Sequence, residues 1–117
     1  MLYAIMIFGA EGVVERLPEA ERDAILDVHS TLQADLEAKG MYRGAIQLMP
    51  PSTAMTVADR GAGTMLLDGP FAESKEQFLG FYLVECETMD DALDAAKALP
   101  QGIAFMEVRP VKWSGGL

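Results

Sequence analysis

Residues 64–87 read TMLLDGPFAESKEQFLGFYLVECE, and this stretch decides how the chain is organised. Two apolar runs, 65–67 and 81–84, flank a loop that opens with Asp-Gly-Pro-Phe at 68–71. The glycine permits a positive φ and the proline fixes its own φ, so the loop begins at a stiff corner. Asp68 is therefore predicted at a strand end, where it either bonds a backbone amide in an Asx-turn or presents its carboxylate to a ligand.

Length and composition limit the class of protein. The 117 residues, half of them hydrophobic, indicate a single folded domain over residues 1–117. Nine Lys and Arg against 18 Asp and Glu give a formal net charge of −9, which argues against nucleic acid and anionic membrane surfaces as partners. The single cysteine, Cys86, excludes an internal disulfide and is expected as a small buried hydrophobe rather than as a reactive thiol.

The start of the chain carries no recognisable targeting signal. The apolar run at residues 1–8 lacks the basic region and the cleavage site of a signal peptide. It is also much shorter than the ~20 residues that a membrane-spanning helix needs. We therefore expect a reduced, cytoplasmic protein.

Apolar periodicity and turn residues predict two helices among six strands. The predicted strands cover residues 2–8, 41–49, 54–60, 64–67, 80–87 and 103–111, and the predicted helices cover residues 18–39 and 89–99. Gly40 is a typical residue to follow the first helix, and Thr88 is a typical N-cap for the second. The order β-α-β-(β-β)-β-α-β predicts an α+β fold, a ferredoxin-like two-layer sandwich with a mainly antiparallel sheet.

The strands 2–8 and 80–87 are apolar on both alternating sets of residues. Two helices cover one face of such a sheet, so the second face would leave a large apolar patch in water. We therefore expect a homodimer that packs sheet face to sheet face with isologous symmetry.

The only histidine, His29, falls on the apolar face of the first predicted helix, together with Ile25 and Leu36. At about 100° per residue it points toward the sheet. One interpretation is a core histidine that is satisfied by a backbone carbonyl. The other is a general acid or base in a cleft between helix and sheet.

Three parts of the sequence resemble the YCII-related, DGPF-domain family. They are residues 68–83, residues 47–57 with their Pro-Pro-Ser-Thr-Ala core, and the closing Glu-Val-Arg-Pro-Val at 107–111. Leu79 departs from the family pattern, which usually has a glycine there. The resemblance covers nearly the whole chain and implies a dimeric α+β barrel, in agreement with the dimer argued from the apolar faces.

The resemblance also implies a site, since a His and an Asp lining a cleft have been proposed as the active centre of YCII-like proteins. His29 matches that histidine, and Asp68 is the natural acidic partner that would fix its tautomer. The substrate-binding candidates are Arg43 or Lys75 for a carboxylate or oxyanion, the Tyr82 hydroxyl at the pocket wall, and Phe71 of the motif. Ordinary surface charge is the alternative for Arg43 and Lys75.

Three function classes follow, and none needs a cofactor or a metal. A nucleophile elbow, a phosphate loop and a metal-spaced His/Cys set are all missing from the sequence. The first class is a cofactor-independent enzyme for proton transfer, elimination, isomerisation or hydrolysis of a small polar molecule. The second is a ligand-sensing module, which the resemblance associates with extracytoplasmic-function sigma factors. The third is a dimer that acts only through a protein partner.

Overall fold

The computed structural model describes residues 1–71 and 74–117; Ala72 and Glu73 of the Asp-Gly-Pro-Phe loop lie outside the described residues. Its helices and strands are β1 (Leu2–Gly9), α1 (Glu19–Ala38), β2 (Tyr42–Gln47), β3 (Met55–Asp59), β4 (Thr64–Asp68), β5 (Gln77–Glu85), α2 (Met89–Lys97) and β6 (Ala104–Pro110), with a 3₁₀ turn at Pro51–Thr53. The predicted order of elements is confirmed.

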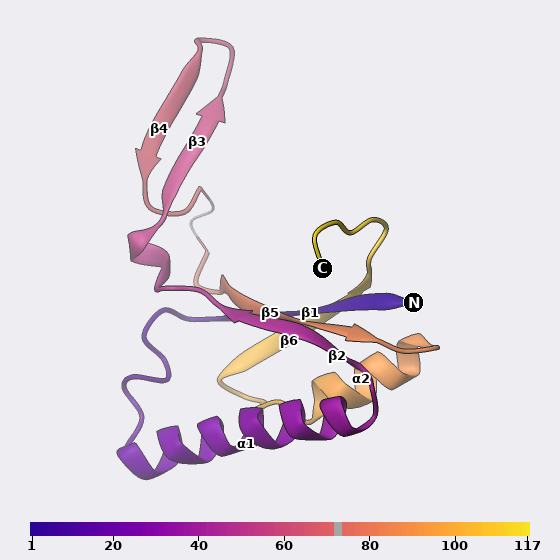
Figure 1. Cartoon of the computed structure of the whole chain (residues 1–117). Helices are drawn as coiled ribbons and strands as arrows, with labels where there is room; N and C mark the ends of the chain where they lie inside the picture. Colours follow the sequence, from indigo (N-terminus) through magenta and orange to yellow (C-terminus); the bar gives the residue numbers. More distant parts are fainter. Residues whose placement is uncertain (72–73) are drawn as a thin grey trace.

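Four strands form one antiparallel sheet in the order β2-β5-β1-β6. Both helices cover the same face of this sheet (Figure 1). The connection β1-α1-β2 leaves room for β5 between its two strands, and β5-α2-β6 repeats the arrangement with β1 in the middle. This is the split βαβ topology, so the predicted α+β fold is confirmed.

The remaining strands, β3 and β4, form a separate two-stranded antiparallel hairpin. The hairpin projects from the side of the sheet that faces away from α1 and α2 (Figure 1). It contributes no hydrogen bonds to the four-stranded sheet, whose strands pair only with one another in the described part of the chain.

The hydrophobic core lies between the sheet and the helices. Alternate residues of the two central strands face the helices and are buried, which follows from the period of two along a strand. The buried residues are Tyr3, Ile5, Tyr82, Val84 and Cys86 from the sheet, Leu32 and Leu36 from α1, and Ala92, Ala95, Ala96 and Leu99 from α2 and the residues after it. Cys86 is therefore a buried free thiol, as predicted.

Local sequence signals correctly predict the start of α2 but not the start of β5. The Thr88 hydroxyl accepts a hydrogen bond from the Asp91 amide at 3.2 Å, so the predicted N-cap is confirmed. Strand β5 begins at Gln77, three residues earlier than predicted, because Phe8 and Gly9 at the end of β1 pair with Phe78 and Gln77 beyond a register shift. Neither described helix has the length and apolar content that crossing a membrane requires.

Candidate functional site

Helix α1 places His29 on the side of the helix that faces the sheet. The helix starts after Pro18, whose fixed φ of −56° suits this position, although no side chain caps the first turn. Leu32 and Leu36 anchor the helix in the core, and His29 lies one turn before Leu32, half-buried. The helix therefore places the imidazole at the edge of the core rather than in bulk water.

Strand β5 supplies the partner of His29. Tyr82 is only 3 % exposed and projects from the helix-facing side of the sheet. Its hydroxyl oxygen lies 2.7 Å from His29 Nδ1, and the two rings are nearly parallel, with centroids 5.9 Å apart and an interplanar angle of 13°. The Tyr42 ring packs against Tyr82 from β2 with a centroid distance of 6.5 Å. Contacts with the His29 and Tyr42 rings thus hold the phenol in position.

Gln33 completes a cluster of three polar side chains. Its Nε2 donates a hydrogen bond to the Tyr82 oxygen at 3.3 Å. Because that oxygen already accepts from Gln33, the Tyr82 hydroxyl is free to donate its own proton to His29 Nδ1. In the tautomer in which Tyr82 is the donor of this contact, the neutral imidazole carries its proton on Nε2 and presents an N–H donor away from Tyr82.

Burial supports the same protonation states. Desolvation lowers the pKa of His29 below its ordinary value of 6.5, so the imidazole is neutral at pH 7. Desolvation raises the pKa of Tyr82 above 10.0, which outweighs the opposite effect of the Gln33 hydrogen bond and keeps the phenol protonated. The cluster at pH 7 is therefore a network of neutral donors and acceptors.

Asp68 occupies a different part of the molecule. It is the last residue of β4, exposed, as the sequence predicted for a strand end. The hairpin that carries it lies on the side of the sheet opposite α1 (Figure 1). Within one chain the structure therefore brings His29 to Tyr82 rather than to Asp68, because the hairpin leaves the sheet away from the helices. The assignment of His29 and Asp68 as catalytic residues stays a prediction.

The other predicted substrate-binding residues are dispersed. Arg43 is exposed, and its Nη1 donates to the carbonyls of Gly40 and Tyr42 at 3.0 and 3.1 Å, so it braces the turn after α1. Lys75 is exposed in the loop before β5. The Phe71 ring is exposed, with the guanidinium carbon of Arg60 4.5 Å from its centroid. Of the four residues, the structure places only Tyr82 beside His29.

Similarity to known proteins agrees with this fold. A model of the YCII-related domain matches residues 1–113. The chain belongs to the YCII-related family. An uncharacterised protein of Rhizobium meliloti (strain 1021) is 35% identical over 114 residues, covering 95% of this chain and 92% of the relative. The similarity therefore runs along the whole YCII-related domain, including both helices and the hairpin.

Gln33 is the member of the site in this YCII-related chain that the sequence analysis did not single out. It lies four residues after His29, and residues at this spacing share one face of a helix. A polar side chain one turn from an inward-facing histidine is therefore a usable signal. This signal becomes informative only when the fold shows that a strand residue such as Tyr82 faces the same side of the helix.

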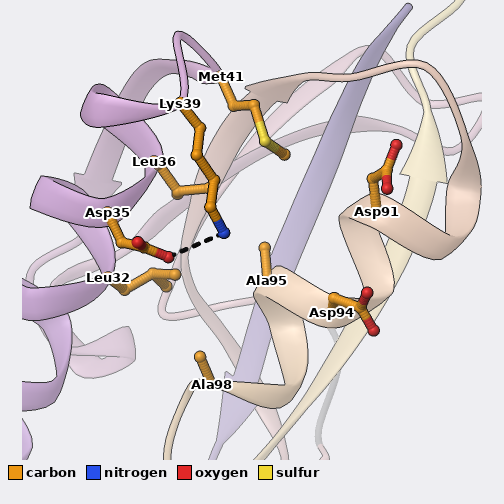
Figure 2. A pocket seen from close by; sticks show the side chains of 9 residues that line it. All are labelled: Leu32, Asp35, Leu36, Lys39, Met41, Asp91, Asp94, Ala95 and Ala98. Carbon is orange, nitrogen blue, oxygen red and sulfur yellow. Dashed lines mark ion pairs between the residues drawn. The ribbon is translucent and has the colours of Figure 1, made fainter.

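Two hollows on the surface of the YCII-related domain lie along α1, beside the cluster rather than on it. Two shallow grooves of about 330 and 380 Å³ run between α1 and α2. Figure 2 shows Leu36 and Ala95 lining the first groove, with Lys39 Nζ paired with Asp35 at 3.2 Å. Neither groove is lined by His29 or Tyr82.

Proposed function

We propose that this YCII-related protein binds a small polar ligand at the cluster of His29, Tyr82 and Gln33. The hydrogen bond of 2.7 Å between His29 Nδ1 and the Tyr82 hydroxyl carries the proposal. It orients a half-exposed imidazole and directs the Nε2 proton to the ligand side. A histidine held in one tautomer by a buried neighbour is a typical recognition or catalytic group.

The ligand is best described as an uncharged compound with a carbonyl or amide oxygen. The chain carries a net charge of −9, which disfavours anions. In the described part of the chain, Lys39 pairs with Asp35 and Arg43 binds carbonyl oxygens at the end of α1, so neither cation is bonded to the cluster. A neutral N–H donor on His29 suits a neutral acceptor oxygen.

The chemistry available to this cluster is polarisation of that oxygen. A neutral imidazole can donate its N–H hydrogen bond to a carbonyl and stabilise the negative charge that develops there. This is the acid half of a cofactor-independent isomerisation, elimination or hydrolysis. Tyr82 and Gln33 hold the ring in position while the charge develops.

The experiment uses a matched pair of ligand probes, acetamide and acetate. They have nearly the same shape and differ in charge. Titration of each into ¹⁵N-labelled protein, followed at the His29 ring nitrogens, should give a saturable shift of Nε2 with acetamide and a weaker response with acetate. The Tyr82→Phe variant should lose the acetamide response. Equal responses in Tyr82→Phe and in wild type would overturn the proposed site.

Ligand sensing without turnover is a second candidate function. The observation that favours it is the composition of the cluster: among the described hydrogen bonds His29 is joined to the Tyr82 phenol, the phenol accepts from the Gln33 amide, and no carboxylate takes part. Catalysis of proton transfer usually needs both an acid and a base. A link to a sigma factor or to another protein partner stays a prediction from the family resemblance.

The same proposal includes a homodimer through the open face of the sheet. The register places Met6, Ile46 and Phe81 side by side on that face. Phe8 stacks on Phe105 with centroids 5.2 Å apart and an interplanar angle of 7°. Such an apolar surface is typical of an interface between subunits. A molar mass of two chains by light scattering, reduced to one by Phe81→Glu, would support this assembly.

A further inference from the structure

The two hollows beside α1 form one continuous groove, because Leu32, Asp35 and Ala98 line both of them. We call it the interhelical groove. Its lining runs from Asp27 on α1 to Lys39 at the end of that helix, and α2 and the residue after it form the opposite wall. At 1.5 Å per residue the α1 wall is about 18 Å long. The interhelical groove can therefore accommodate about three turns of a helix.

The floor of the interhelical groove is apolar. Leu32 and Leu36 line it from α1, and both belong to the buried core. Ala95 and Ala98 point toward them from the α2 side (Figure 2). Because a methyl group is much shorter than a leucine side chain, these alanines leave space between the helices. Apolar side chains of another molecule could fill this space and remove hydrocarbon surface from water.

The rim of the interhelical groove is acidic on both sides. Asp27 and Asp35 border it on α1, Asp91 and Asp94 border it on α2, and all four residues are exposed. Lys39 also borders the groove, and its Nζ is paired with Asp35 at 3.2 Å. Asp27 and Asp35 are eight residues apart, which is about 12 Å along the helix. A single cationic group could therefore meet only part of this rim, whereas a chain of several positive charges could meet all of it.

The charge of the whole helical layer limits which partners can approach the groove. Helices α1 and α2 carry nine of the 18 acidic residues of the chain and two of its nine basic residues. Such a surface repels a second copy of this chain, a nucleic acid and an anionic membrane. It attracts a partner that carries several positive charges.

We propose that the interhelical groove binds a basic amphipathic helix of a partner protein. The apolar stripe of that helix packs on Leu32, Leu36 and Ala98, with side chains at three- and four-residue spacing. Its lysine and arginine side chains reach the carboxylates on both rims. The inference goes beyond the ligand site, since neither His29 nor Tyr82 lines the groove.

The probe for the first test is a fluorescent synthetic peptide of about 12 residues, which matches the length of the groove. It has leucine at every third or fourth position and lysine at the others. One control peptide has glutamate in place of lysine, and a second has the same composition with the leucines spread around the helix. Fluorescence anisotropy with the full chain should show saturable binding of the amphipathic basic peptide alone. Equal affinity for the second control would overturn the proposal, because binding would then depend on charge without the apolar floor.

Two matched pairs of variants locate the binding site. Ala98→Leu fills the groove without a change of charge, while Ala34→Leu adds the same side chain at an exposed position of α1 that does not line it. Asp27→Asn removes a rim charge, while Asp23→Asn removes a charge one turn earlier on α1. We expect the peptide Kd to rise at least tenfold in Ala98→Leu and about threefold in Asp27→Asn, with no change in either control. An equal Kd within both pairs would overturn the proposal.

A small organic cation is the competing occupant, and methyl NMR distinguishes it from a helix. In ¹³C-methyl-labelled protein the Leu32 and Leu36 resonances should shift saturably with the amphipathic peptide. The small amine n-butylamine should leave them unchanged, because it offers one positive charge and a short apolar stem. Saturable shifts with n-butylamine and none with the peptide would place a small amine in the groove and overturn the proposed protein partner.

Discussion

His29 on α1 and Tyr82 on β5 are joined by a hydrogen bond of 2.7 Å between Nδ1 and the phenol oxygen. The two residues are 53 positions apart in sequence, so the contact ties the first helix to a central strand of the sheet. It also determines which ring nitrogen of the only histidine is available to a ligand. The proposed function depends on this one contact.

The stability of the protein should depend on the charge of His29. Its pKa is lowered in the folded state, so the unfolded chain binds the proton more readily. The free energy of unfolding should therefore fall as the pH drops below about 6.5 and be unaffected by this group above that value. Urea unfolding of wild type and His29→Gln between pH 5 and 8 measures the effect. The wild type should lose stability relative to the variant at low pH, and the opposite trend would contradict the burial of a neutral imidazole.

Removal of the Tyr82 hydroxyl should destabilise the fold. Tyr82→Phe leaves His29 Nδ1 and the Gln33 amide without their shared partner, which should cost about 1–2 kcal/mol. Tyr42→Phe is the matched control, since Tyr42 contacts the same ring but makes no side-chain hydrogen bond in the described part of the chain. Thermal unfolding of both variants measures the difference. Equal melting temperatures of the two variants would show that the Tyr82 hydroxyl does not contribute to stability.

Gly80 should tolerate no side chain. A Cβ at this position would clash with the backbone carbonyl of Ile46 on the neighbouring strand β2. Gly80→Ala should therefore cost about 1–3 kcal/mol and weaken the pairing of β2 with β5. In Gly115→Ala the new methyl group would meet only the Trp113 side chain in the exposed tail, so this variant is the control. Hydrogen exchange of the Ile46 amide reports on the strand pairing directly.

The N-cap of α2 should contribute a measurable share of stability. Thr88→Ala removes the acceptor of the Asp91 amide hydrogen bond and should cost about 1 kcal/mol. Ser114→Ala, in the exposed C-terminal tail, should change stability by less than about 0.5 kcal/mol. Chemical unfolding of the two variants gives the comparison. A cost for Thr88→Ala no larger than the control would mean that α2 is fixed by packing alone.

The elements of the fold could be read from local sequence patterns. Apolar periodicity, Gly40 and Thr88 located both helices to within a few residues, because these signals act within a few positions of each other along the chain. The start of β5 was missed because the bulge opposite Phe8 is set by pairing between distant strands. The direction in which the hairpin leaves the sheet could not be predicted from the sequence either, because it too depends on contacts between distant segments.

The candidate site was only partly predictable. The helical phase of His29 correctly directed it toward the sheet. Its partner could not be chosen in the same way, since Asp68 and Tyr82 belong to the strands on either side of the same loop and only the tertiary path of the hairpin separates them. Gln33 gains its meaning from the position of Tyr82, so it could not be recognised from helix spacing alone.

The most direct test of the site is the titration of the His29 ring nitrogens by ¹⁵N NMR in wild type, Tyr82→Phe and Asp68→Asn. We expect a wild-type pKa below 6.5 with the proton of the neutral form on Nε2, a higher pKa in Tyr82→Phe, and no change in Asp68→Asn. A wild-type pKa above 6.5 that falls in Asp68→Asn and stays unchanged in Tyr82→Phe would contradict the account and show that Asp68 is the partner of His29.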